Sequence, residues 1–158
     1  MQRMEDWMLP PEKKKPPRPM QAAAIAGFVG ALLLFAIQLG LQTLARGDAP
    51  LGTMFATKVL GLRGLAALLA GTFSFCLAGA FWGALYAALV EKIAAVSGLL
   101  FGFAPWLVTM LVMLPIVGRP VFAGGEVKKI LLWLALSLLW GAFVGASTPS
   151  LNKPRLAA

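Results

Sequence analysis

The chain has 158 residues, of which 59% are hydrophobic and only 13% are charged, and its mean hydropathy is +0.82. Soluble domains are typically about half apolar and about a quarter charged, so this composition excludes an ordinary soluble domain. The net charge of +8 lies mainly beside apolar segments, and no folded soluble domain is expected to carry a basic face. Nucleic acid is therefore not an expected partner.

Four long segments contain no charged residue, and they run over residues 20–45, 64–90, 93–118 and 130–152. Each exceeds the roughly 20 apolar residues that cross about 30 Å of hydrocarbon. None has the charged face of a soluble amphipathic helix. The sequence predicts an all-α polytopic membrane protein with transmembrane helices over residues 22–44, 64–90, 94–117 and 130–147. This four-helix domain occupies residues 21–148, between tails over residues 1–20 and 149–158.

The first 20 residues are expected to form a basic, proline-rich cytoplasmic tail. Prolines disfavour regular helix, while tryptophan and basic side chains suit the interface with anionic headgroups. A solvated tail attracted to lipid is one interpretation, and a docking arm for a partner protein is the alternative. The expected membrane-surface anchors are Trp7, Lys13, Lys14, Lys15 and Arg18.

The first span carries two amides one helical turn apart, Gln38 and Gln42. Its apolar part is longer than the roughly 7–15 residues of a cleaved signal peptide, so a signal anchor is expected. Polar groups inside a membrane mark either structural contacts or function. Bridging between helices is the default interpretation of Gln38, and hydrogen bonding of both amides to a quinone or a lipid headgroup is the alternative. Beyond this span, a short interfacial helix is expected, with Met54, Phe55, Val59 and Leu62 on one face.

Small residues recur four apart in the spans, which lets helix backbones approach closely in lipid. The first span has the row Ala23, Gly27 and Ala31, and the later spans each have a GxxxG motif. Contacts within the chain are the first interpretation, and contacts with a partner subunit are the second. The candidate packing residues are Gly27, Gly79, Gly83, Gly98, Gly102, Gly141 and Gly145.

The third span contains Pro105 in the middle of FGFAPWLVTM. Proline removes a backbone hydrogen bond and crowds the carbonyl four residues earlier, so a kink is expected, eased by Gly102.

Short matches between the two halves suggest a duplicated helical hairpin. WGALYAA at residues 82–88 resembles WGAFVGA at 140–146, and GFVGALLLFA at 27–36 loosely matches GLLFGFAPWL at 98–107. Two tandem hairpins of this kind would be related by an axis along the membrane normal.

Residues for catalysis are scarce. The chain has no histidine, and its one cysteine, Cys76, lies inside the second span. The carboxylates are scattered over the tail and the loops, so we expect no enzyme activity, no cofactor and no metal site. The density of Lys and Arg before the first span favours a cytoplasmic N-terminus, and an even number of spans then places both termini in the cytoplasm.

Two segments carry a resemblance to a known protein family, namely GAFWGALYA (79–87) and GLLFGFAPWLVTMLVMLP (98–115). The layout resembles an uncharacterised family of small bacterial four-span inner-membrane proteins, over residues 20–147. This sequence lacks the histidine that the second span of many members carries. The resemblance implies location in the bacterial inner (cytoplasmic) membrane and supplies no catalytic residue.

The function expected from these patterns is that of a non-catalytic integral membrane protein, a structural accessory or assembly subunit of a larger membrane complex, such as an energy-transducing one. Its expected partners are membrane lipids and other transmembrane subunits. One alternative is a small oligomeric transporter or channel, which predicts a water-accessible cavity reaching Gln38, Thr72 or Thr109. Another is a lipid- or quinone-binding membrane protein.

Overall fold

The computed structural model of the chain describes residues 19–45 and 48–152. All regular structure in these two ranges is helical, and four helical segments are long and apolar enough to cross a membrane. The prediction of an all-α, four-helix membrane protein is confirmed. The expected surface anchors Trp7, Lys13, Lys14, Lys15 and Arg18 lie outside the described residues.

Three of the spans are single α-helices, namely α1 (Pro19–Ala45), α3 (Gly64–Leu89) and α7 (Val127–Leu151). α1 begins three residues before the expected start of the first span, because proline is tolerated in a first turn whose N–H groups lack helical partners. The third span is divided into α4 (Ala95–Phe101), α5 (Phe103–Val108), the π-helical turn η2 (Thr109–Met113) and α6 (Leu114–Ile116). The 3-10 helix η3 (Val121–Gly125) leads into α7.

The short helix α2 (Leu51–Lys58) connects α1 to α3. It buries Leu51, Gly52 and Ala56, whereas Val59, which was expected on the apolar face, is exposed. A Cβ on Gly71 would lie 2.6 Å from the backbone nitrogen of Thr53, so α2 packs directly on α3. Small residues therefore hold α2 against the bundle.

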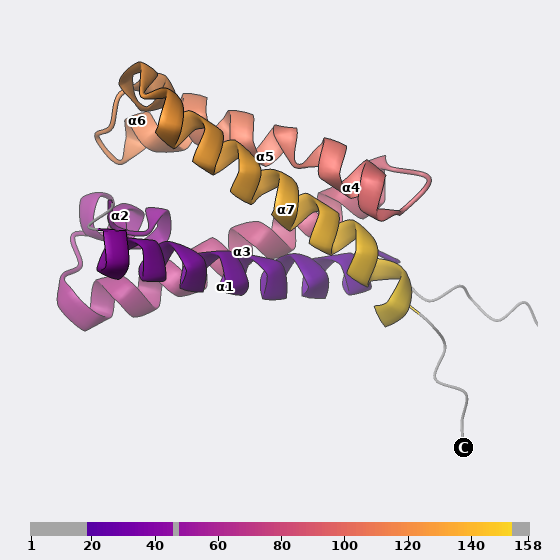
Figure 1. Cartoon of the computed structure of the whole chain (residues 1–158). Coiled ribbons are helices and arrows are strands. Elements are labelled where there is room, and N and C mark those ends of the chain that lie inside the picture. The colour runs from indigo at the N-terminus through magenta and orange to yellow at the C-terminus, as the bar shows by residue number, and fades with distance from the viewer. Residues whose placement is uncertain (1–18, 46–47, 153–158) are drawn as a thin grey trace, which may run out of the picture.

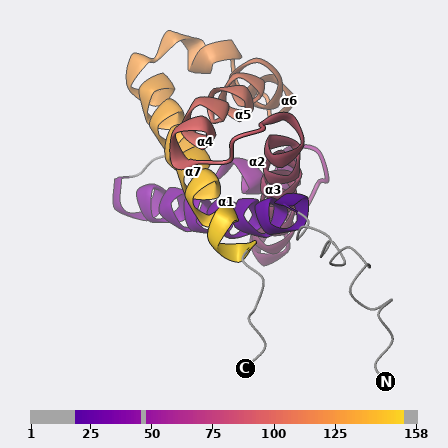
Figure 2. The ribbon, with the colours of Figure 1, turned by 90° about the vertical axis from the view of Figure 1, so that its right-hand side faces the viewer.

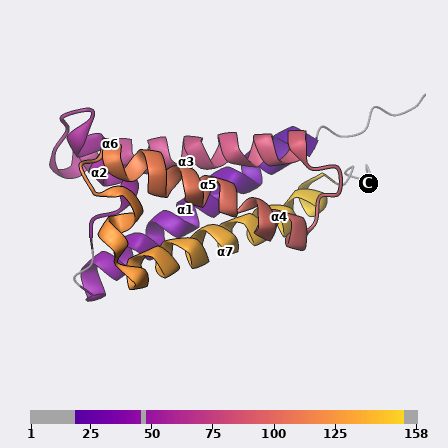
Figure 3. The ribbon, with the colours of Figure 1, turned by 90° about the horizontal axis from the view of Figure 1, so that it is seen from above.

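The spans form two antiparallel hairpins, one of α1 with α3 and one of the third span with α7. Figure 1 shows α7 running obliquely from the region of α6 to cross α1. α1 begins and α7 ends at the same end of the molecule (Figures 1 and 2). Seen from above, α2 and α6 lie at the opposite end from α4 (Figure 3).

Large apolar side chains face outward. On α3 they form a row at four-residue spacing, so they share one face of the helix. In the part of α1 before Phe35 the interior contacts use small residues instead, since Ala23, Ala26 and Ala31 are all buried. This distribution suits a lipid environment, where association depends on close packing of backbones. The exposed row on α3 consists of Leu65, Leu69, Phe73, Leu77 and Phe81.

Candidate functional site

Glycines lie where α1 meets α3 in the first hairpin. A Cβ on Gly27 would collide with the carbonyl oxygen of Gly79 and lie 3.2 Å from Gly83 Cα. A Cβ on Gly83 would collide in turn with the carbonyl oxygen of Ala23. The two backbones are therefore too close for any side chain larger than hydrogen at these positions.

The second hairpin repeats this contact. A Cβ on Gly98 would collide with the carbonyl oxygen of Gly141 and lie 2.9 Å from Gly145 Cα. A Cβ on Gly145 would collide with the carbonyl oxygen of Ala94, and one on Gly102 would lie 2.5 Å from that of Ser137. The backbones of α4 and α7 thus meet in the same way as those of α1 and α3.

The two sets of contacts define which positions of the hairpins correspond. By its contacts, Gly27 corresponds to Gly98, as the alignment of the first and third spans implies. By its contacts, however, Gly83 corresponds to Gly145. The match between WGALYAA and WGAFVGA would instead align Gly83 with Gly141. The alignment of the second and fourth spans is therefore shifted by one helical turn.

Trp140 joins the two hairpins. Its indole Nε1 donates a hydrogen bond of 3.2 Å to the carbonyl oxygen of Gly27. A Cβ on Gly30 would lie 2.9 Å from the indole ring, so glycine is needed to admit it. Trp140 is buried, in a cluster with Ala26 and Tyr86. α1 and α7 are thereby fixed where they cross.

A cavity of about 150 Å³ lies between the hairpins. Four aromatic side chains, Phe75, Trp82, Trp133 and Trp140, form part of its wall, together with residues of the irregular third span. Regular α-helix is interrupted at Gly102, three residues before Pro105. Thr109, the first residue of the π turn, donates a hydrogen bond of 2.8 Å from Oγ1 to the Pro105 carbonyl. The lining residues from the third span are Pro105, Val108, Thr109 and Met113.

Gln38 is the most deeply buried polar residue in the cavity wall, with 6% exposure. Its Oε1 accepts a hydrogen bond of 3.1 Å from the backbone nitrogen of Leu51, the first residue of α2. Gln38 therefore satisfies one of the free N–H groups of that helix. This contact also identifies the other terminal atom as Nε2, since only the oxygen can accept.

The amide nitrogen of Gln38 is buried and has no hydrogen-bond partner among the residues that the structure describes. A buried donor left unpaired costs about 1–3 kcal/mol. An acceptor atom entering the cavity at this wall would recover that free energy. Gln42 is only half-buried and is not a lining residue, so the structure places the two predicted amides in different surroundings.

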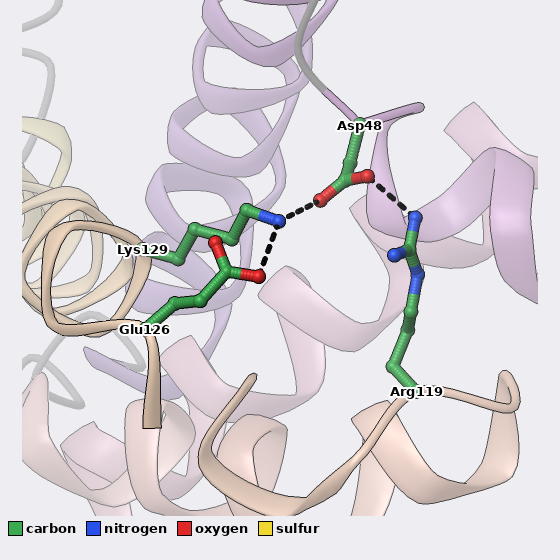
Figure 4. Close-up of polar contacts among 4 residues, drawn as sticks. All are labelled: Asp48, Arg119, Glu126 and Lys129. Carbon is green, nitrogen blue, oxygen red and sulfur yellow. Dashed lines mark hydrogen bonds and ion pairs between the residues drawn. The ribbon is translucent and has the colours of Figure 1, made fainter. Parts of the chain in front are cut away.

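Charged side chains gather beside α2 and η3 (Figure 4). Arg119 Nη2 lies 2.5 Å from Asp48 Oδ1, and Lys129 Nζ lies 3.2 Å from Asp48 Oδ2 and 3.1 Å from Glu126 Oε1. Burial raises the pKa of the Asp48 carboxyl, but the hydrogen bond from Lys129 and the charge of Arg119 outweigh it, so that pKa lies below its ordinary value of 3.8. These four residues, called here the charged cluster, line a second cavity of about 120 Å³.

Sequence reasoning singled out Gln38 but missed the aromatic wall and the charged cluster. Asp48 and Arg119 are 71 residues apart, and no local pattern indicates that they meet. Within the two described ranges, no group of three or more His, Cys, Asp or Glu residues could hold a metal ion. The fold and the site define a four-span, all-α membrane protein with an apolar cavity between two hairpins. Comparison with protein-family models, curated proteins and solved structures finds no match to this chain.

Proposed function

We propose that this protein is a non-catalytic, multi-pass membrane protein that binds a lipidic molecule between its two helical hairpins. The observation that carries the proposal is that Gln38, a residue of the wall of an apolar cavity, has an amide nitrogen that is unpaired within the described residues. Pockets for small molecules combine mostly apolar walls with a few polar groups that orient the ligand. Gln38 supplies such a group here.

The lining indicates a neutral ligand group. No Asp, Glu, Lys or Arg belongs to the lining of this cavity in the described part of the chain. A free carboxylate would lack a partner charge there, and burying it would cost several kcal/mol. A carbonyl oxygen, as in a quinone or a lipid ester, needs only the hydrogen bond that Gln38 offers.

The volume limits how much of the ligand enters. An apolar cavity of about 150 Å³ accommodates a benzene molecule, and this cavity has a similar volume of about 150 Å³. One ring, or a short stretch of acyl chain beside a carbonyl, therefore fits without rearrangement. The remainder of the molecule would extend into the surrounding bilayer.

The experiment is to purify the full-length chain with its native lipids and to measure bound molecules by native mass spectrometry. Gln38→Leu should abolish retention of the bound lipid, whereas Gln42→Leu, which changes a half-buried amide outside the cavity wall, should retain it. Because Gln38→Leu also removes the cap of α2, Ala78→Phe provides a second test. It places bulk in the cavity wall without altering Gln38 or Leu51. Retention of the lipid by Gln38→Leu and Ala78→Phe at the level of Gln42→Leu would overturn the proposal.

An accessory or assembly subunit is a second candidate function. The observation that favours it is the exposed row on α3, which forms the kind of ridge that packs into the groove of another helix. Purification in mild detergent, with Phe73→Ala and Phe81→Ala as variants, should then recover a partner subunit with the wild type and less of it with the variants. A chain that is monomeric and without partners would contradict this candidate.

The transporter alternative gains less support. The cavity reaches Gln38 and Thr109 but not Thr72, and aromatic and aliphatic side chains form most of its lining. Paths for ions or protons in membranes are lined by ionisable or coordinating groups. The lining therefore favours an apolar ligand over a hydrated solute.

For location, our proposal is the bacterial inner membrane with both termini in the cytoplasm, as the family resemblance and the basic tail suggest. The shared end of α1 and α7 supports placing the termini on one side. Alkaline phosphatase fused after residue 158 should be inactive, and the same enzyme inserted in the 59–63 linker should be active. The reverse result would contradict the orientation.

A further inference from the structure

We infer, on the basis of the proposed function, that the bound lipid is a glycerophospholipid with a zwitterionic headgroup. Its headgroup is taken by the charged cluster in the second cavity, and its apolar part by the cavity at Gln38. The inference rests on the adjacency of the two cavities at Trp133, the charge balance of the cluster and the amide of Gln38 in the wall of the first cavity.

The two cavities adjoin at Trp133. This residue lines both of them, and it lies one helical turn after Lys129 on α7. The second cavity thus changes from charged residues to Met54, Leu114 and Trp133 within one wall. A single amphiphilic molecule matches this change in the lining, because its polar headgroup would lie at the charged residues and its apolar part would lie beyond Trp133 in the first cavity.

The charges of the cluster are balanced. Arg119 and Lys129 carry one positive charge each, and Asp48 and Glu126 one negative charge each. A phosphodiester accepts charge-assisted hydrogen bonds from guanidinium and ammonium groups, while a headgroup ammonium pairs with the carboxylates. A purely anionic headgroup would leave both carboxylates facing negative charge. The zwitterion is therefore the better match.

The existing ion pairs do not prevent such an exchange. The side chains of Arg119, Lys129 and Asp48 are 42%, 37% and 38% exposed, so water screens their mutual attraction. Ion pairs this exposed contribute little to stability. A headgroup that supplies one phosphate and one ammonium replaces both partners of a pair at the same time.

The position of Gln38 fits the ester region of this lipid. Gln38 precedes the end of α1 at Ala45 by seven residues, which is about 10 Å along a helix axis. Asp48 follows that end. In a glycerophospholipid the ester carbonyls lie between the phosphate and the acyl chains. An ester carbonyl is therefore the acceptor for the amide nitrogen of Gln38.

The test uses the full-length chain in nanodiscs made from equal amounts of phosphatidylethanolamine and phosphatidylglycerol with identical acyl chains. Bound lipids are counted after transfer to detergent. The wild type should enrich phosphatidylethanolamine at least five-fold. The double variant Asp48→Asn with Glu126→Gln should bring the ratio close to one, and Gln38→Leu should lower retention of both lipids. Lys128→Gln, at an exposed residue outside both cavities, is the matched control and should behave as the wild type.

The outcomes separate the two proposals. Retention that depends on Gln38 but is equal for both headgroups, or greater for phosphatidylglycerol, overturns the zwitterion inference and leaves the proposed function standing. Retention that is unaffected by Gln38→Leu and by Ala78→Phe overturns the proposed function as well. The comparison of the two lipids on the wild type requires no substitution, so a variant that fails to fold does not remove the test.

Discussion

At the scale of single residues, the connection before α7 adopts a backbone conformation that side chains disfavour. Phe122 and Ala123 have φ of 49° and 51°, and Gly124 follows with φ of 68°. L-residues in this left-handed region cost about 1–2 kcal/mol each. Phe122 is held by Trp106, with ring centroids 6.0 Å apart in an edge-to-face arrangement. That contact compensates part of the strain at Phe122. The methyl side chain of Ala123 cannot make an aromatic contact of this kind.

Substitution of Ala123 by glycine should therefore stabilise the protein. Glycine occupies the left-handed region without the Cβ conflict, so we expect the free energy of unfolding to rise by about 0.5–1 kcal/mol. Unfolding by sodium dodecyl sulfate, followed by tryptophan fluorescence, measures this change. Gly124→Ala is the opposite control, since φ is 68° and a Cβ would lie 3.2 Å from Pro120 Cγ, and it should destabilise. A loss of stability in Ala123→Gly would contradict the assigned backbone.

Among individual side chains, Gln38 has two roles that the sequence raised as alternatives. Its oxygen bridges α1 to α2 through Leu51, which is the structural role. Its nitrogen has no hydrogen-bond partner in the described part of the chain, and Gln38 lines the cavity, which is the basis of the proposed binding role. One carboxamide can serve both because its acceptor and its donor are separate atoms.

At the scale of helices, the contacts of glycines decide which spans pair. The sequence predicted that Gly27, Gly79, Gly98 and Gly141 pack helices, and left open whether they do so within the chain. In the structure Gly27 lies against Gly79, and Gly98 lies against Gly141. These residues are therefore occupied by contacts within the chain, and a partner subunit would have to use another surface.

A bulky residue at one of these contacts should separate a hairpin. Gly79→Leu places a side chain where a Cβ alone would lie 2.6 Å from the Gly27 carbonyl oxygen, so we expect a loss of at least about 2 kcal/mol in the free energy of unfolding. Gly40→Leu, on α1 with none of the described residues within 4 Å of its Cβ position, is the matched control and should change the free energy of unfolding by less than about 0.5 kcal/mol. Equal effects of the two substitutions would show that the close approach of α1 and α3 is absent.

The third span has breaks in its helix that its apolar sequence pattern does not fully predict. Pro105 predicts a kink in the turn before it, and regular α-helix is interrupted at Gly102 in that turn, while the π turn at Thr109–Met113 beyond the proline was not predicted. π turns insert one extra residue into a helix and are frequent at functional sites. Thr109 and Met113, the first and last residues of this turn, both line the cavity. The irregular part of the span is thus the part that faces the candidate site.

At the scale of the whole molecule, contacts of several kinds join the hairpins. Trp140 bonds to Gly27 near the end that carries the described termini, and the charged cluster joins Asp48 to Arg119 and Lys129 near α2. The first contact is buried and the second is partly exposed to water. Buried apolar residues, among them Leu51 and Met110, also pack together near α2, so only the ion-pair part of the contact at that end should depend on pH.

This contribution should be lost in acid. Because the pKa of Asp48 is below its ordinary value of 3.8 in the folded state, its ion pairs contribute fully at pH values above 3.8, and the contribution disappears as the pH falls through the lowered pKa. Asp48→Asn should cost about 1 kcal/mol or less at neutral pH, because the pairs are exposed. The difference between wild type and Asp48→Asn in detergent unfolding should shrink as the pH is lowered below 3.8. A difference that does not shrink there would contradict the role of the ion pairs.

The sequence by itself determined that this chain crosses a membrane four times as helices. Lipid cannot hydrogen-bond to backbone groups, so charge-free runs such as residues 64–90 must fold as helices whatever their neighbours are. It also indicated the small residues on which such helices depend. Only the tertiary structure decided which glycines meet, that Trp133 lines two adjoining cavities, and that Asp48 pairs with Arg119. These facts depend on how two hairpins cross, and that geometry arises from contacts between residues far apart in the chain, which no local pattern records.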